Sequence, residues 1–252
     1  MDRARHVPAP PPAGGPHPRT ATIVLAGGRS RRMGGVDKTR LAVGGASSLE
    51  RVLAAAPLGP RIIVGPGDGV PAGVVAVRED PPFSGPVAAL ERGVREAEAL
   101  LGAAVAPASE VDVLVLGGDM PLLERGALEM LLGAAGPPDP AAAAAERSIR
   151  PLAAAPPMRP VRVAVVEDGH REFLCAAWPL PLLRACLDEV RGGEGDWRDL
   201  SLRRLYARIP DELLCEVPLP GHVTADIDTP ETLATARARA AAHDPEFPSS
   251  GI

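Results

Sequence analysis

Residues 25–38 read LAGGRSRRMGGVDK, and they directly follow an apolar run over residues 21–24. A loop so rich in glycine and positive charge is a poor place to build a core. In an α/β sheet, the segment behind a strand's carboxyl end lies where such folds bind ligands. Its N–H groups approach an anion closely, and arginine grips two phosphate oxygens at once. The stretch therefore predicts a nucleotide cradle, with a solvated turn as the alternative.

Two well-known phosphate-binding loops do not fit this stretch. A P-loop has glycine immediately before its lysine, whereas Asp37 precedes Lys38 here. A dinucleotide fingerprint needs the spacing G-x-G-x-x-G, which the glycines at 27, 28, 34 and 35 do not provide. The cradle must therefore be of another kind, with its charge supplied by Arg29, Arg31, Arg32 and Lys38.

Apolar runs and helical patterns alternate along the chain. We expect strands at 22–25, 61–64, 74–77 and 111–116, and helices from Ser48 as N-cap, at 86–101 and at 124–135. After a Pro/Ala-rich connection at 136–160 we expect strands at 162–166 and 174–177, a helix at 180–190, a Gly-rich break at 192–195 and a last helix from Pro230. This order predicts an α/β fold, a three-layer, Rossmann-like and mostly parallel sheet with helices on both faces.

Composition limits the class of protein further. The formal net charge of −5 argues against a nucleic-acid binder, and no apolar run is long enough to cross a membrane. The three cysteines have no metal-type spacing, which indicates buried, inert thiols. We expect a cytoplasmic protein with a disordered N-terminal arm (1–19), one domain (20–242) and a flexible tail (243–252). Within the domain, 20–135 is the expected nucleotide-binding half and 136–242 the acceptor half.

Carboxylates follow several of these elements. Asp119 comes directly after the 111–116 strand, where it could hold Mg²⁺ or cap a helix. Asp226 and Asp228 share one side of an extended segment before the last helix, although Asp228 or Thr229 could instead be its N-cap and Asp226 merely solvated. Asp80 lies in the loop before the 86–101 helix. Each signal is weak alone, but their order along one α/β chain favours a nucleotide site.

Four motifs carry a resemblance to a known family. LAGGRSRRMGGVDK, EDPPFSGPVAAL, LGGDMPLL and DIDTPETL follow one another in this order over roughly residues 20–240. In order and spacing they resemble the molybdenum cofactor guanylyltransferase family, within the wider group of nucleotidyltransferases. The chain departs from the family at Asp226 and Asp228, where asparagines are common, and at Glu172–Cys175, where Gln-Pro-Leu or His-Pro is common.

The resemblance implies a role for individual residues. It implies nucleotide binding by Leu25, Ala26, Gly27, Lys38, Asp80 and Asp119, and Mg²⁺ binding by Asp119. Beyond the resemblance, our hypothesis is that GTP also lies over Gly28, that Lys38, Asp119 and Arg32 act in catalysis, and that Asp228 holds Mg²⁺ together with Asp119. The implied reaction is transfer of GMP from GTP to molybdopterin with loss of pyrophosphate. A molybdoenzyme or chaperone is the expected protein partner.

Two other functions stay open at this point. Within the same class, the chain could be a cytidylyltransferase of molybdopterin or act on another small phosphate such as phospholactate. From a different class, it could be a non-catalytic nucleotide-binding module or a regulatory partner in molybdoenzyme assembly. The presence of both Lys38 and Asp119 speaks against loss of chemistry.

Overall fold

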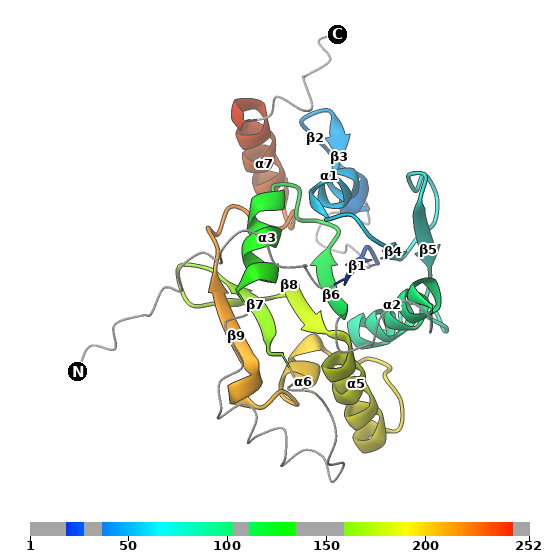
Figure 1. Cartoon of the computed structure of the whole chain (residues 1–252). Helices are drawn as coiled ribbons and strands as arrows, with labels where there is room; N and C mark the ends of the chain where they lie inside the picture. The colour runs from blue at the N-terminus through cyan, green and yellow to red at the C-terminus, as the bar shows by residue number, and fades with distance from the viewer. Residues whose placement is uncertain (1–18, 28–36, 103–110, 135–158, 244–252) are drawn as a thin grey trace, which may run out of the picture.

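The computed structural model describes residues 19–27, 37–102, 111–134 and 159–243 (Figure 1). A sheet of seven strands runs through the molecule in the order β5-β4-β1-β6-β8-β7-β9. Its strands are β1 (Arg19–Leu25), β4 (Arg61–Val64), β5 (Val74–Val77), β6 (Val111–Gly117), β7 (Val161–Val165), β8 (Arg171–Pro179) and β9 (Leu214–Pro218).

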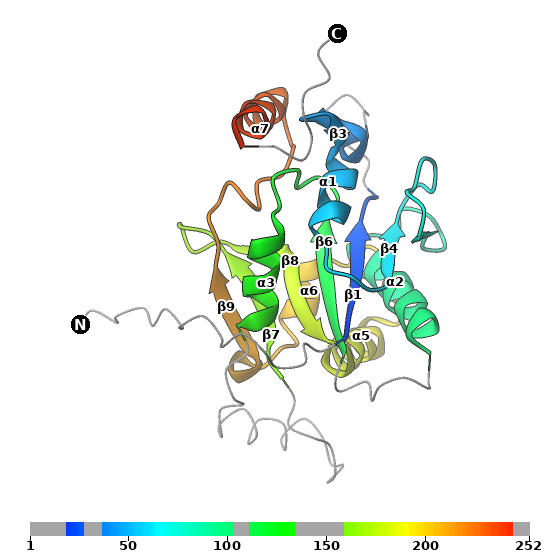
Figure 2. The same ribbon diagram turned by 45° about the horizontal axis from the view of Figure 1, so that its top comes forward.

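The sheet is mostly parallel, as the sequence predicts. β1 pairs in parallel with β4 and β6, β4 with β5, and β7 with β9, whereas β8 runs antiparallel to both of its neighbours. Every residue of β6 is buried, as expected for a strand covered on both faces. Figure 2 shows β1 and β6 side by side in the middle of the molecule.

Helices cover both faces of the sheet, which confirms the three-layer architecture. One core lies beneath α2 (Pro86–Leu101), α5 (Leu180–Glu194) and α6 (Leu202–Tyr206). A second core lies beneath α1 (Ser48–Ala55) and α3 (Arg125–Gly133). Gly93 lets α2 approach the sheet closely, because a Cβ there would lie only 2.6 Å from Ile23 Cγ2.

A smaller third core stands apart from the sheet. It joins α7 (Pro230–His243) to the hairpin of β2 (Ala42–Val43) and β3 (Ala46–Ser47). Two 3₁₀ turns complete the described elements, η2 (Lys38–Arg40) and η4 (Asp211–Leu213). No helix among the described residues is long and apolar enough to cross a membrane.

Two expectations about helix ends are wrong. Ser47, not Ser48, is the N-cap of α1, because Ser47 Oγ accepts the Glu50 amide while the Glu50 carboxylate accepts the Ser47 amide. The break expected at 192–195 begins too early, since α5 continues through Gly192 and Gly193 to Glu194 and is capped by Gly195, whose φ is 86°. Glycine lowers helix propensity without forbidding helix, so only the left-handed residue ends it.

The predicted disordered arm lies almost wholly outside the described residues. Gly28, Arg29, Arg31 and Arg32 of the opening loop lie outside them as well. His243, placed in the expected tail, is the last residue of α7.

Candidate functional site

The sheet reverses its direction of growth between β1 and β6. From β1 the chain builds outward through β4 and β5, then returns to place β6 on the other side of β1. The ends of the two strands are level, since Leu25 is in register with Gly117, and the Gly118 amide donates to Leu25 O at 3.0 Å. Ligands of open α/β sheets bind in the crevice outside such a switch point.

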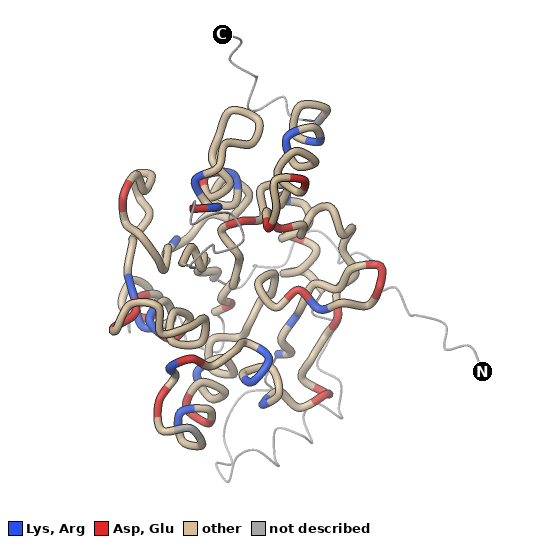
Figure 3. Tube along the Cα trace, turned by 180° about the vertical axis from the view of Figure 1, so that it is seen from behind, with Lys and Arg blue, Asp and Glu red and all other residues tan. Residues whose placement is uncertain are grey.

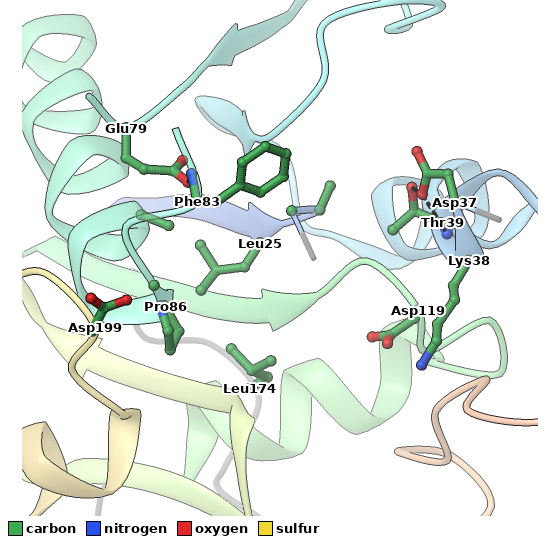
Figure 4. Close-up of a pocket in the computed structure, with 14 residues that line it drawn as sticks. Leu25, Asp37, Lys38, Thr39, Glu79, Phe83, Pro86, Asp119, Leu174 and Asp199 are labelled. Atoms are coloured by element: carbon green, nitrogen blue, oxygen red, sulfur yellow. Dashed lines mark hydrogen bonds between the residues drawn. The ribbon is translucent and has the colours of Figure 1, made fainter. Parts of the chain in front are cut away.

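A cavity of about 460 Å³ opens at this edge of the sheet (Figure 4). Its lining comes from the ends of β1 and β6, from η2, from the start of α2 and from a loop behind α5. The lining residues are Leu25, Ala26, Gly27, Asp37, Lys38, Thr39, Glu79, Phe83, Gly85, Pro86, Ala89, Asp119, Leu174 and Asp199.

The three backbone positions predicted behind β1 line this cavity. Leu25 and Ala26 are buried, whereas Gly27 is exposed. The Ala26 amide already donates to Val64 O at 3.0 Å, and Leu25 O already accepts the Gly118 amide. Of these three residues, a ligand therefore meets chiefly the exposed backbone of Gly27.

Asp37 holds the turn that carries Lys38. Its carboxylate accepts hydrogen bonds from the Thr39 amide at 3.0 Å and from Thr39 Oγ1 at 2.7 Å, and so caps η2. Lys38 is the first residue of that turn, and its ammonium forms an ion pair with Asp228. The side chain of Lys38 is only 12% exposed, so its charge is directed into the site rather than into solvent.

Glycines let the turn behind β6 pack against its neighbours. A Cβ on Gly118 would lie 3.1 Å from Thr39 Cγ2, and one on Gly117 would lie 3.0 Å from Asp119 Oδ1. Larger residues would push η2 or the Asp119 carboxylate away. On the far side of the turn, Arg51 Nε of α1 donates to Pro121 O at 2.6 Å. The position of Asp119 is therefore fixed from both sides.

The capping alternatives for Asp119 and Asp228 do not hold. The nearest following helix, α3, begins only at Arg125 with Glu124 as its N-cap. At α7, Thr229 is the cap, because its Oγ1 accepts the Thr232 amide at 3.3 Å. Neither carboxylate caps a helix, and that of Asp228 pairs with Lys38 instead.

The turn that carries Asp226 and Asp228 is tied directly to the turn that carries Asp119. The Ile227 amide donates to Asp119 O at 3.0 Å. Ile227 itself is buried in the third core, between α7 and the β2–β3 hairpin. Since η2 leads straight into that hairpin, the same core sets Asp228 opposite Lys38.

Three carboxylates converge as a result. Oxygens of Asp119, Asp226 and Asp228 lie within 4.8 Å of one another. Clustered carboxylate oxygens are the donors that Mg²⁺ and Mn²⁺ prefer, so the residues fit such an ion. We predicted Mg²⁺ binding for Asp119 and Asp228 but not for Asp226, which belongs to the cluster as well. The signal was its position on the same side of an extended segment as Asp228.

Burial shapes the electrostatics of the cluster. Desolvation and the neighbouring charge of Asp226 raise the pKa of Asp119, while Lys38 opposes that rise. Burial also raises the pKa of Glu172, and the negative charge of Asp226 raises it further. A cation would relieve the repulsion among these carboxylates. Figure 3 shows acidic and basic positions interspersed over the described chain, and Lys38 is the one basic residue in the described lining of the cavity.

Asp80 lies beside the cavity rather than in its lining. It is exposed, whereas its neighbour Glu79 lines the cavity and accepts the Phe83 amide at 2.8 Å. Nucleotide contact by Asp80 stays a prediction.

The sequence did not indicate Leu174 or Asp199, which reach the cavity from the second half of the chain. Leu174 lies where the β7–β8 register shifts, and such bulges re-aim side chains.

The cysteines have no nucleophilic role in this site. Cys175 is fully buried in β8, and desolvation raises the pKa of its thiol to about 12. Burial raises the pKa of Cys186 to about 12 as well. A thiol in this state is inert at neutral pH. The expectation of buried thiols holds for these two, whereas Cys215 is only half-buried, with a pKa that burial also raises.

Residues 22–209 match the model of the MobA-like NTP transferase domain. No curated protein sequence matches the chain. Among solved structures, the fold is similar to molybdopterin-guanine dinucleotide biosynthesis protein A from Archaeoglobus fulgidus, with a TM-score of 0.57 and 17% identity over 88% of this chain and 100% of that one.

Two further structures share the fold. One is 2-C-methyl-D-erythritol 4-phosphate cytidylyltransferase from Thermus thermophilus, with a TM-score of 0.54 and 19% identity over 88% of this chain and 98% of that one. The other is Rv0371c from Mycobacterium tuberculosis in complex with manganese, with a TM-score of 0.52 and 17% identity over 87% of this chain and 98% of that one. At these identities the neighbours show the fold alone.

Proposed function

This chain belongs to the family of MobA-like NTP transferase domains, and we propose that it transfers GMP from GTP to molybdopterin with release of pyrophosphate. The observation that carries the proposal is the meeting of three distant turns at the switch point. Lys38 comes from the first, Asp119 from the second and Asp228 from the third. A triphosphate carries several negative charges, which a cation bound at the cluster and the buried lysine would together neutralise.

Mg²⁺ is the cofactor that we propose, held by Asp119, Asp226 and Asp228. When bound, it would neutralise charge on the phosphate oxygens and orient them for displacement. Lys38 contacts one of these carboxylates, so its ammonium lies beside the place where the phosphates would be.

In this reaction the side chains mainly position the reactants. An oxygen of the acceptor's phosphate attacks the α-phosphorus of GTP, and the bond from that phosphorus to the oxygen bridging to the β-phosphorus breaks. Pyrophosphate leaves with the bonding electrons. Because the attacking oxygen is already anionic, no general base is required. Lys38 stabilises the charge, and the cavity walls hold the nucleotide in line. Arg32, also predicted to be catalytic, lies outside the described residues.

A second candidate is transfer of CMP, favoured by the similar fold of the Thermus thermophilus cytidylyltransferase. Delivery of the product to a molybdoenzyme or its chaperone stays a prediction.

The test is a nucleotide panel. The full chain is supplied with Mg²⁺, molybdopterin and one of the four NTPs, and pyrophosphate release is measured. Release with GTP alone supports the proposal, and release with CTP alone selects the second candidate. Nucleotide binding without release in any combination would mean a non-catalytic binding module.

A further inference from the structure

The cavity has two chemically different ends (Figure 4). At one end are Lys38 and Asp119, beside the acidic cluster. At the other end, around the start of α2, are Glu79, Phe83 and Asp199. Between them the walls are apolar, formed by Leu25, Pro86, Ala89 and Leu174.

This division fixes which way a nucleotide lies. Phosphates go to the end with Lys38 and the cation-binding carboxylates, because Lys38 is the one basic residue in the described lining and a bound cation would add to its charge, whereas the opposite end offers only the carboxylates of Glu79 and Asp199. The base then lies on the apolar walls, and its polar edge faces Glu79 and Asp199. A carboxylate accepts hydrogen bonds and donates none, so this end selects a base with N–H groups on that edge.

Of the two carboxylates, Asp199 is the one not engaged elsewhere. Glu79 already accepts the Phe83 amide at 2.8 Å. The carboxylate of Asp199 makes no hydrogen bond or ion pair with the residues that the structure describes.

The backbone of Asp199 is nevertheless held firmly. Its amide donates to Ser84 O at 2.7 Å, and its φ of 56° lies in the left-handed region that aspartate tolerates. A Cβ on Gly85 would lie 3.3 Å from the backbone of Asp199, so the two loops are in close contact. The backbone of Asp199 is therefore held at the end of the cavity, and its exposed carboxylate is an acceptor that a ligand there can reach.

Guanine fits a lone carboxylate better than the other bases do. Its Watson–Crick edge carries two adjacent donors, the N1–H and the N2 amino group, which a carboxylate accepts together. Adenine and cytosine place an acceptor nitrogen next to their amino group, and uracil flanks its N–H with two carbonyls, so each would set an acceptor against Asp199. We propose that Asp199 is the residue that selects guanine, an inference that rests on the proposed nucleotidyltransferase function.

An exchange of hydrogen-bond pattern tests this inference. Asp199→Asn keeps an acceptor for N1–H but offers a donor where the carboxylate had an acceptor. It should lose affinity for GTP by about tenfold or more, the order expected for a charged hydrogen bond. It should gain affinity for xanthosine triphosphate, in which a carbonyl replaces the N2 amino group. Asp188→Asn, an exposed carboxylate on α5 outside the cavity lining, is the matched control.

Titration calorimetry of the full chain with Mg²⁺ and GTP, ITP, XTP or CTP gives the readout. Weaker binding of ITP, which lacks the amino group, together with a gain of XTP binding only in Asp199→Asn, supports the inference; misfolding would produce no such gain. An unchanged ranking of GTP, ITP and XTP in Asp199→Asn overturns the role of Asp199 while leaving nucleotide binding intact. If the wild-type chain binds no nucleotide, the proposed function itself fails.

Discussion

The carboxylate of Asp119 is half-buried at the end of β6, close to the carboxylates of Asp226 and Asp228. Without a bound cation, a hydrogen bond from its own backbone amide and the charge of Lys38 oppose the desolvation and the repulsion that raise its pKa. A charged carboxylate in this position lowers the stability of the folded chain, a cost that the proposed cation would offset. Function and stability therefore make opposite demands at this position.

Asp119→Asn should separate the two demands. Turnover should fall by about 100-fold or more, because a charge that would hold Mg²⁺ against the reacting phosphates is lost. In metal-free buffer at neutral pH, the midpoint of thermal unfolding should rise, since the neutral amide avoids the cost of burying a charge. The two measurements are a pyrophosphate assay and calorimetry in the presence of a chelator.

The pH dependence of the stability difference follows from the direction of the pKa shift. The pKa of Asp119 is raised in the folded chain above 3.8, so the folded state binds this proton more tightly than the unfolded state does. Its contribution to stability is lost as pH rises through the folded pKa. The advantage of Asp119→Asn should be full at neutral pH and vanish below the unfolded pKa. Equal stabilities at pH 7 would contradict this description of Asp119.

Among the elements, α2 can lie close to the sheet because Gly93 has no side chain. Gly93 faces β1 and β4, where a Cβ would lie 2.6 Å from Ile23 Cγ2 and 3.0 Å from Val64 Cγ2. Both are methyl groups of buried, β-branched residues that cannot turn aside. The start of α2, including Gly85 and Pro86, forms one wall of the cavity, so its distance from the sheet matters for the site.

Gly93→Ala should destabilise the chain by about 1–3 kcal/mol, the usual cost of overpacking. That cost exceeds the gain of up to about 1 kcal/mol from alanine's higher helix propensity. Gly192→Ala in α5 is the control, because nothing lies within 4 Å of the added Cβ, and it should be neutral or stabilising. Urea denaturation compares the two. A stabilised Gly93→Ala would show that α2 does not pack as described.

The sequence predicts the sheet well where local patterns are strong. The boundaries of β4, β5 and α2 follow the expected 61–64, 74–77 and 86–101. The sequence did not predict some short or exposed elements, among them the β2–β3 hairpin and β9. Two-residue strands and strands at a sheet edge carry little periodic signal.

The site was predictable only in part, for a physical reason. Lys38 and Asp119 lie in dense local motifs behind the first and central strands, and the structure brings both to one cavity. Asp199 comes from a loop behind α5 and reaches the cavity through contacts with the Ser84–Gly85 turn. No local pattern reports a contact between segments so far apart in the chain.

At the scale of the whole molecule, a buried ion-pair group links the two halves of the sheet away from the cavity. Asp112 of β6 contacts Arg162 of β7 and Arg159, each at 2.6 Å. Asp112 and Arg162 are both 0% exposed, and Arg162 also donates to Leu132 O at 2.8 Å. β8 lies between their strands, so the pair spans the antiparallel part of the sheet.

Asp112→Asn should destabilise the chain by about 3–5 kcal/mol, because it leaves the Arg162 charge buried without its counter-ion. Asp68→Asn makes the same chemical change on a side chain that is 93% exposed, and should alter stability by less than about 0.5 kcal/mol. Chemical denaturation of both variants gives the comparison. A loss below about 1 kcal/mol for Asp112→Asn would mean that water or a rearrangement compensates Arg162.

The most direct measurement is a crystal of the full chain grown with Mn²⁺ and a non-hydrolysable GTP analogue, with anomalous scattering used to locate the metal. We expect the manganese peak among the carboxylates of Asp119, Asp226 and Asp228, the triphosphate beside Lys38, and guanine against the start of α2. Manganese bound elsewhere, with a nucleotide whose phosphates do not touch Lys38, would contradict the convergence of the three turns on one nucleotide.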